Sequence, residues 1–151
     1  MPLLRPAVLL PGRAQGPLLK LSADISLWGG VDPLTGKIID PRHPEYGRFI
    51  TGKILAMNRS IGSSSGSSIL LELLQRNRGP LGIILVQPDF IVTLGVVVAR
   101  EMGVGDIPVV RVDPVEFSRL PADAQVSLAD GVIQLPDIRR ESAPPRPGTA
   151  Q

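Results

Sequence analysis

Hydrophobic and polar positions alternate strictly at residues 19–25, a pattern typical of a strand with one buried face. Residues 49–57 predict a second long strand, in which Gly52 suggests a bulge. Short, continuous apolar runs at residues 81–86 and 107–112 indicate two further strands. Because these runs have no polar alternation, we expect both strands to be buried on both faces in the middle of a sheet.

Two other segments have the pattern of helices. Residues 69–76 place leucine and isoleucine at helical spacing on one face, and a Gly-Pro pair soon afterwards ends this helix. Residues 90–102 are long enough for a second, mostly buried helix. Near the end of the chain, residues 123–128 and 131–135 have the pattern of a terminal hairpin.

The middle of the chain therefore reads strand–helix–strand–helix–strand, with hairpin-like strands on both sides. This order predicts an α/β fold, and we expect a three-layer β/β/α domain. The predicted domain covers residues 17–137 and follows an N-terminal extension, residues 1–16, that three prolines interrupt. Residues 138–151 are rich in proline and are expected to be a disordered tail.

Composition and charge exclude several classes of function. The 151 residues suffice for one domain, and an aromatic content of 3% requires an aliphatic core. The net charge is only +2 and the basic residues are scattered, so we expect neither nucleic-acid binding nor a polybasic membrane surface. The longest apolar stretch is about half of the roughly 20 residues that span a bilayer. Without the continuous apolar run of a signal peptide, the chain is expected to be soluble and cytoplasmic.

The sequence contains no cysteine and one histidine, His43. It therefore offers no thiolate ligands for an iron–sulfur cluster and too few imidazoles for a zinc site. We expect no metal site in this chain, so that any metal chemistry would have to come from a partner.

Residues 62–68 consist of glycine and serine alone and lie between a predicted strand and a predicted helix. The unpaired N–H groups at a helix N-terminus bind carboxylate or phosphate, and they would stabilise a serine alkoxide that acts as a base. The segment has neither the Gly-Lys-Ser/Thr of a Walker loop nor the spacing of a Gly-x-Ser-x-Gly elbow. Two interpretations follow from the residues alone: an anion-binding helix N-terminus with an activated serine, or an ordinary cap or flexible loop.

Three motifs, in this order and spacing, resemble the swivel domain of aconitase X. They are LSADISLWGGVDP at residues 21–33, then Thr35-Gly36 and Ile39-Asp40 with His43-Pro44, then GKIL at residues 52–55 leading to GSSSGSSILLE at residues 62–72. The resemblance covers residues 18–135 and implies the three-layer swivelling domain that forms the C-terminal domain of aconitase.

The resemblance also implies an activity. In two-subunit members of this family a large subunit holds an iron–sulfur cluster through cysteines, and the small subunit supplies the swivel domain. We therefore expect this chain to bind no cofactor itself and to dehydrate a small hydroxy acid only as a heterodimer with such a subunit. Ser63 is implied as the proton acceptor, and Gly62, Ser64 and Ser65 as substrate-binding residues. The cluster iron would act as a Lewis acid on the leaving hydroxyl.

The sequence departs from the family's pattern beside the serines. Members usually have Gly-Arg-Gly-Ser or Gly-Lys-Gly-Ser where this chain has Ser-Ile-Gly-Ser at residues 60–63, so that Arg59 or the large subunit would have to supply the charge that Ile61 lacks. The serine-rich loop favours cis-3-hydroxy-L-proline as the substrate. The alternatives are a mevalonate 5-phosphate dehydratase small subunit and a non-catalytic swivel or regulatory subunit. A phosphohistidine carrier is disfavoured because no histidine lies near Gly29-Gly30.

Other conspicuous residues have ordinary structural interpretations. Asp24, at a strand end, and Asp32, before a proline, have two interpretations, as acids that face the active site or as turn formers, and we favour the turns. Trp28 is predicted to be a packing anchor at a subunit interface, and His43 to be structural or interfacial. Glu72 precedes an arginine by four positions and is predicted to form an exposed i,i+4 ion pair.

Overall fold

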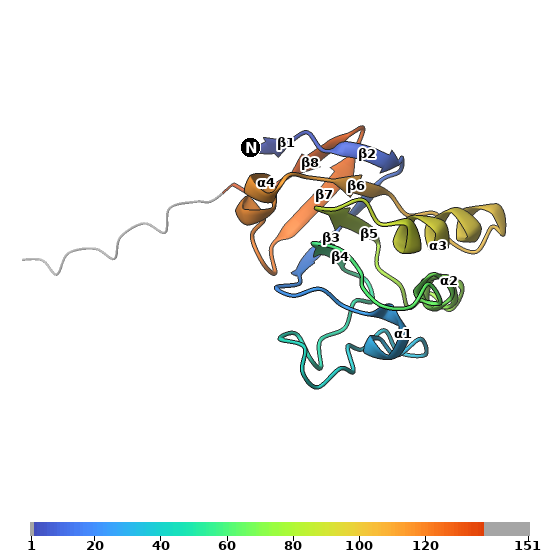
Figure 1. Ribbon diagram of the computed structural model, residues 1–151. Coiled ribbons are helices and arrows are strands. Elements are labelled where there is room, and N and C mark those ends of the chain that lie inside the picture. Colours follow the sequence, from blue (N-terminus) through green and yellow to red (C-terminus); the bar gives the residue numbers. More distant parts are fainter. Residues whose placement is uncertain (1, 138–151) are drawn as a thin grey trace, which may run out of the picture.

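The computed structural model describes residues 2–137, and Figure 1 shows how their strands and helices are arranged. Eight strands in this part of the chain form one sheet, in the order β1-β8-β7-β3-β4-β5-β6-β2. The strands are β1 (Leu3–Leu4), β2 (Ala7–Leu10), β3 (Ala14–Lys20), β4 (Ile54–Met57), β5 (Gly82–Leu85), β6 (Val109–Arg111), β7 (Gln125–Ala129) and β8 (Val132–Gln134). The helices are α1 (Leu27–Gly30), α2 (Gly66–Gln75), α3 (Phe90–Glu101) and α4 (Pro114–Arg119).

Strand β3 joins a parallel and an antiparallel half of the sheet. Its first residues, from Ala14 to Pro17, pair antiparallel with β7, whereas Leu18, Leu19 and Lys20 pair parallel with β4. Strands β4, β5 and β6 continue the parallel half, with α2 and α3 as the crossovers that parallel neighbours require. The strand–helix–strand–helix–strand order predicted from the sequence is confirmed.

The ends of the sheet are brought together by the first residues of the chain. Strand β1 pairs with β8 at one end of the strand order, and β2 pairs with β6 at the other end. Only Arg5 and Pro6 separate the two strands, a connection that spans at most about 11 Å. The sheet must therefore fold over on itself into two layers, and Figure 1 shows β1 and β2 passing above β8 and β6.

Two hydrophobic clusters fill the spaces between the resulting three layers. Along β4, Leu55 and Met57 belong to the cluster that contains the buried faces of α2 and α3, whereas Ile54 and Ala56 belong to the cluster between the two sheet layers. This division follows from the alternation of side chains along a strand. Each central strand is thus buried on both faces, and the predicted three-layer β/β/α fold is confirmed.

Two of the predicted strands have different bounds in the structure. The strand predicted at residues 19–25 is β3, which ends at Lys20, and the strand predicted at residues 49–57 shortens to β4. The alternation at residues 19–25 has another cause, because Leu21 and Ile25 are buried in the same cluster as Ile38 and Ile50 of the following long loop. Burial in a core cluster thus extends the alternation beyond the end of the paired strand.

Two short helices were not predicted. Helix α1 is a single turn with non-helical φ and ψ at Trp28 and Gly29, so it remains close to the predicted glycine-rich turn. Helix α4 begins after Asp113, whose side chain accepts a hydrogen bond from the Glu116 N–H, with Pro114 in its first turn. An N-cap acid followed by proline is a helix start signal, and here it identifies a helix too short for periodicity to reveal.

The structure does not support the predicted N-terminal extension. Strands β1 and β2 and the first residues of β3 lie within residues 1–16 and pair with β8, β6 and β7. The three prolines that suggested an extension lie outside the strands, where they interrupt no ladder. The predicted tail, residues 138–151, lies outside the described residues.

The N-terminal strand can be tested with two neighbouring leucines. Leu4 is 7% exposed and packs between the sheet layers, whereas Leu3 is 49% exposed. We expect Leu4→Ala to lower the free energy of unfolding by about 2–3 kcal/mol through lost burial and a new cavity. Leu3→Ala should change it by less than about 1 kcal/mol. Urea unfolding of both variants measures the difference, and equal stabilities would contradict the place of β1 in the domain.

Candidate functional site

Two loops meet at the carboxyl ends of the parallel strands β3 and β4, the edge at which ligands bind in open α/β sheets. Ile25 and Ser60 form a parallel bridge, and the Ile61 N–H donates to the Ile25 carbonyl over 2.9 Å. Gly62 has a φ of +89°, and a Cβ at this position would lie 2.7 Å from the Ser26 Oγ. A side chain at position 62 would therefore be strained and would collide with the neighbouring loop.

The predicted serines form the turn that leads into α2. The Ser63 Oγ accepts a hydrogen bond from the Ser65 N–H over 3.1 Å, and the Ser63 carbonyl accepts one from the Gly66 N–H over 3.0 Å. Ser65 is the N-cap residue, but its side chain accepts no capping hydrogen bond. Gly62, Ser63, Ser64 and Ser65 are all exposed.

This geometry is compatible with anion binding. The serines precede a ten-residue helix whose N-terminus carries partial positive charge, and its first three N–H groups donate to the carbonyls of Ser63, Ser64 and Ser65. The N–H that donates to the Ser63 Oγ favours the charged form of that oxygen, because hydrogen bonding to an anion stabilises it. The roles of Ser63 as a base and of Gly62, Ser64 and Ser65 in substrate binding stay predictions.

Residues 60–66 form the serine loop, and a buried acid that was not predicted, Asp89, fixes its beginning. The Asp89 Oδ2 accepts hydrogen bonds from the Ser60 N–H and from the Ser60 hydroxyl, both at 2.6 Å. The Asp89 Oδ1 accepts from the N–H groups of Ile91 and Val92, and so caps α3. A Pro-Asp pair before an apolar helix signals an N-cap, but nothing in the sequence indicates a contact with Ser60.

Asp24 contacts the two residues that precede the serine loop, Asn58 and Arg59. The Asn58 Nδ2 donates to the Asp24 Oδ1 over 3.0 Å, and the Arg59 Nε lies 3.5 Å from the Asp24 Oδ2. These contacts of the Asp24 side chain are not those of the predicted turn, and they hold Arg59, the cation two positions before Ile61. The Ile61 side chain, where the family's basic residue is missing, is 42% exposed.

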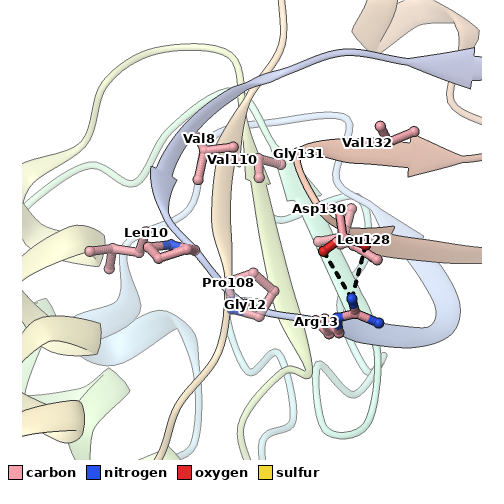
Figure 2. A pocket seen from close by; sticks show the side chains of 12 residues that line it. Val8, Leu10, Gly12, Arg13, Pro108, Val110, Leu128, Asp130, Gly131 and Val132 are labelled. Atoms are coloured by element: carbon pink, nitrogen blue, oxygen red, sulfur yellow. Dashed lines mark hydrogen bonds and ion pairs between the residues drawn. The ribbon is translucent and has the colours of Figure 1, made fainter.

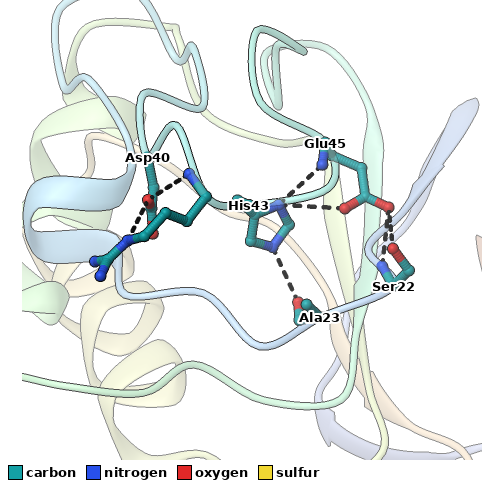
Figure 3. Close-up of polar contacts among 6 residues, drawn as sticks. Ser22, Ala23, Asp40, His43 and Glu45 are labelled. Atoms are coloured by element: carbon teal, nitrogen blue, oxygen red, sulfur yellow. Dashed lines mark hydrogen bonds and ion pairs between the residues drawn. The ribbon is translucent and has the colours of Figure 1, made fainter.

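His43 lies outside the serine loop and has a structural role. Its Nε2 is 3.1 Å from the Ala23 carbonyl, and its Nδ1 accepts from the Glu45 N–H (Figure 3). The Glu45 Oε1 accepts from the N–H and the hydroxyl of Ser22. These contacts tie the segment after β3 to the following loop, and the structural interpretation of His43 is confirmed.

The remaining predicted residues lie as follows. The Asp32 carboxylate accepts from the Leu34 N–H and the Thr35 hydroxyl, which confirms its turn, and Glu72 pairs with an arginine over 3.1 Å. The predicted interface residue Trp28 lies in a different place. Its side chain is 58% exposed, and with Asp40 it lines a shallow hollow of about 330 Å³. The Arg42 N–H, which donates to Asp40, holds the pKa of that carboxyl below its ordinary value. The role of Trp28 at a subunit interface stays a prediction.

A separate pocket of about 300 Å³ opens between β2 and the β7–β8 hairpin. Its walls are mostly aliphatic, and the Arg13–Asp130 ion pair, 2.9 Å long, lies at its rim (Figure 2). None of the residues that line it comes from the serine loop. Because no polar groups other than this exposed pair converge on it, we assign no chemistry to this pocket.

The residues present do not fit an iron–sulfur cluster. The sequence has no cysteine, and within residues 2–137 no three His, Asp or Glu side chains gather as metal ligands. In the same part of the chain, no helix has the length and apolar character needed to cross a bilayer.

Comparison with known sequences identifies relatives of two kinds. Cis-3-hydroxy-L-proline dehydratases from Hypocrea jecorina and Pseudomonas aeruginosa are 43% and 40% identical over 81% and 95% of this chain. The matched regions are only 20% and 24% of those proteins, so this chain spans about a quarter or less of their length. The phosphomevalonate dehydratase small subunit of Methanothrix thermoacetophila is 34% identical, over 82% of this chain and 93% of the relative.

Comparison with solved structures and with family models agrees with these relatives. A chain in the crystal structure of holo-form aconitase X from Thermococcus kodakaraensis is 30% identical and superposes with a TM-score of 0.80, over 91% of this chain and 100% of that chain. The family model described as the aconitase X swivel domain matches residues 3–135, which include the strands before residue 17. The chain belongs to the aconitase X swivel domain family.

Proposed function

We propose that this chain is the small subunit of a two-subunit hydro-lyase of the aconitase X type, which acts in the cytoplasm and dehydrates a β-hydroxy acid. The observation that carries the proposal is the exposed Ser63, held by a backbone N–H at the start of α2 in a chain of this family. The two-subunit arrangement is supported by the small-subunit relative from Methanothrix thermoacetophila, which the chain matches over 93% of its length. In the hydroxyproline dehydratases the matched region is a quarter or less of a longer protein, which supports the need for a larger second part but not its place on a separate chain.

In the proposed reaction, the substrate carboxylate binds at the N-terminus of α2, where the hydroxyls of Ser64 and Ser65 donate hydrogen bonds to it. The Ser63 oxygen, as alkoxide, takes the proton from the carbon next to that carboxylate. The electron pair of the broken C–H bond forms the double bond, and the hydroxyl on the neighbouring carbon leaves. The N–H of Ser65 stabilises the Ser63 alkoxide before the proton is transferred.

An iron–sulfur cluster on the large subunit would supply a Lewis acid for the departing hydroxyl. We place the cluster there because clusters of this kind are held by thiolates and this sequence contains no cysteine. The proposed partner is therefore a cysteine-containing chain that closes over the exposed serine loop.

We propose cis-3-hydroxy-L-proline as the substrate rather than mevalonate 5-phosphate. A phosphoryl group is recognised by arginine or lysine side chains with free hydrogen-bond donors. In this chain Ile61 occupies the position where the family has arginine or lysine, and the nearby Arg59 already pairs with Asp24. Mevalonate 5-phosphate remains the second candidate substrate, because the chain is similar to proteins named phosphomevalonate dehydratase small subunit.

Two other roles fit the geometry less well. A phosphohistidine carrier needs an accessible imidazole, whereas His43 is buried and both of its ring nitrogens have partners. A non-catalytic swivel or regulatory subunit would not need an exposed hydroxyl at a helix start.

Replacement of Ser63 tests the proposed function. After co-expression with the cluster-bearing chain, we expect Ser63→Ala to assemble with an intact cluster spectrum but to lower kcat by about 10² to 10⁴-fold, the contribution of a general base. Ser68→Ala, an exposed serine inside α2, is the matched control and should keep normal turnover. Ordinary turnover by Ser63→Ala would show that another group takes the proton.

Restoring the basic residue tests the choice of substrate. We expect the natural complex to turn over cis-3-hydroxy-L-proline with the higher kcat/KM, because the loop lacks a free cation for a phosphoryl group. Ile61→Arg should raise kcat/KM for mevalonate 5-phosphate by about 10-fold, the value of one hydrogen bond between charged groups. Steady-state kinetics with both substrates measures the change, and a natural preference for the phosphorylated substrate would contradict our choice.

A further inference from the structure

Asp89 and Ser60 form a buried polar pair beneath the serine loop. They are 8% and 7% exposed, and His43 is the only other buried polar side chain among residues 2–137. Within this part of the chain Asp89 has no ion-pair partner, and its two oxygens accept hydrogen bonds from four neutral donors. A carboxylate removed from water is destabilising unless it is hydrogen-bonded, and the four donors satisfy this one.

The four donors belong to two different elements. Two of them are the N–H groups of Ile91 and Val92 in the first turn of α3, and the other two are the N–H and the hydroxyl of Ser60. A helix cap requires only the first two contacts. The contacts with Ser60 are short, at 2.6 Å, and join positions 29 residues apart in the sequence.

The N-terminus of α3 contacts the serine loop at both ends, through the N-cap residue Asp89 and through Ile91 in the first turn. At the beginning of the loop, Asp89 binds Ser60, which also bridges Ile25 on its other side. At the end of the loop, Gly66 packs so closely on Ile91 that a Cβ on the glycine would lie 3.1 Å from the Ile91 Cγ2. The five residues between these fixed points, 61–65, include Ser63.

We propose that Asp89 is a positioning residue for Ser63. Its carboxylate joins the start of α3 to the start of the serine loop, and thereby fixes where the Ser63 oxygen lies relative to the N-terminus of α2. The proposal rests on the proposed role of Ser63 as proton acceptor. Position matters at such a group, because a displacement of about 1 Å can lower the rate by about 10²-fold.

The two roles of Asp89 can be separated by Asp89→Ser. Serine is as good an N-cap as aspartate, so its single oxygen keeps the start of α3. It cannot reach Ser60 as well, so the loop loses both contacts. Asp113→Ser is the matched control, because Asp113 caps α4 through the Glu116 N–H and has no contact with the serine loop.

Amide hydrogen exchange of the purified chain tests the effect on the loop without reference to any activity. We expect Asp89→Ser to speed up exchange at residues 60–66, while the amides of Ile91 and Val92 stay as protected as in the natural protein. Asp113→Ser should leave both regions unchanged. Unchanged exchange at residues 60–66 in Asp89→Ser would overturn the proposal.

Kinetics of the assembled complex then test the effect on Ser63. Per assembled complex, we expect Asp89→Ser to lower kcat by about 10 to 10²-fold with little change in KM. In a Ser63→Ala background the same substitution should have no further effect, because it acts through the missing hydroxyl. A loss that is equally large in both backgrounds would overturn the positioning role. Normal turnover by Ser63→Ala alone would contradict the proposed function. If Ser63→Ala is inactive but Asp89→Ser has a normal kcat, only the positioning role of Asp89 is contradicted.

Discussion

The parallel pairing of β3, β4 and β5 is the constraint on which the rest of the structure depends. Parallel strands end at the same edge of a sheet, so the segments that leave them are neighbours in space however far apart they are in sequence. The segment after β3 carries Asp24, the segment after β4 carries the serines, and the segment after β5 carries Asp89. The strand order alone brings these three segments together. The polar contacts between them then fix the positions of individual side chains.

The sequence predicted the buried strands and helices well because their side chains report burial directly. Residues 81–86 are apolar throughout since β5 faces a hydrophobic cluster on each side. The same signal misled at residues 21–25, where Leu21 and Ile25 are buried in the core although β3 ends at Lys20. Periodicity thus identifies which side chains are inside, but it does not identify what covers them. The first strands were missed for the opposite reason, since short edge strands flanked by prolines have little periodicity to detect.

The candidate site could be predicted in part. Gly62 and Ser63 stand out because residues 62–68 consist of glycine and serine alone, although this composition also fits an ordinary cap or loop. Asp89 does not stand out, because an acid before a helix is fully explained as a cap, and its second partner, Ser60, becomes a neighbour only when β4 and β5 pair. The pairing of Asp24 with Arg59 is hidden in the same way, since the two residues lie in loops that follow different strands. Local sequence reveals groups that can act, whereas tertiary contacts determine which groups hold them.

The folding of the sheet onto itself also affects how the chain behaves in solution. Its two edge strands, β1 and β2, have two and four residues, and prolines lie beside both of them. An edge so short offers few consecutive N–H and C=O groups to which another polypeptide could add a strand. Proline also removes a donor wherever it stands beside such an edge. A domain with a largely aliphatic core and exposed sheet edges would otherwise be prone to edge-to-edge aggregation, and the short, proline-flanked edges limit that risk.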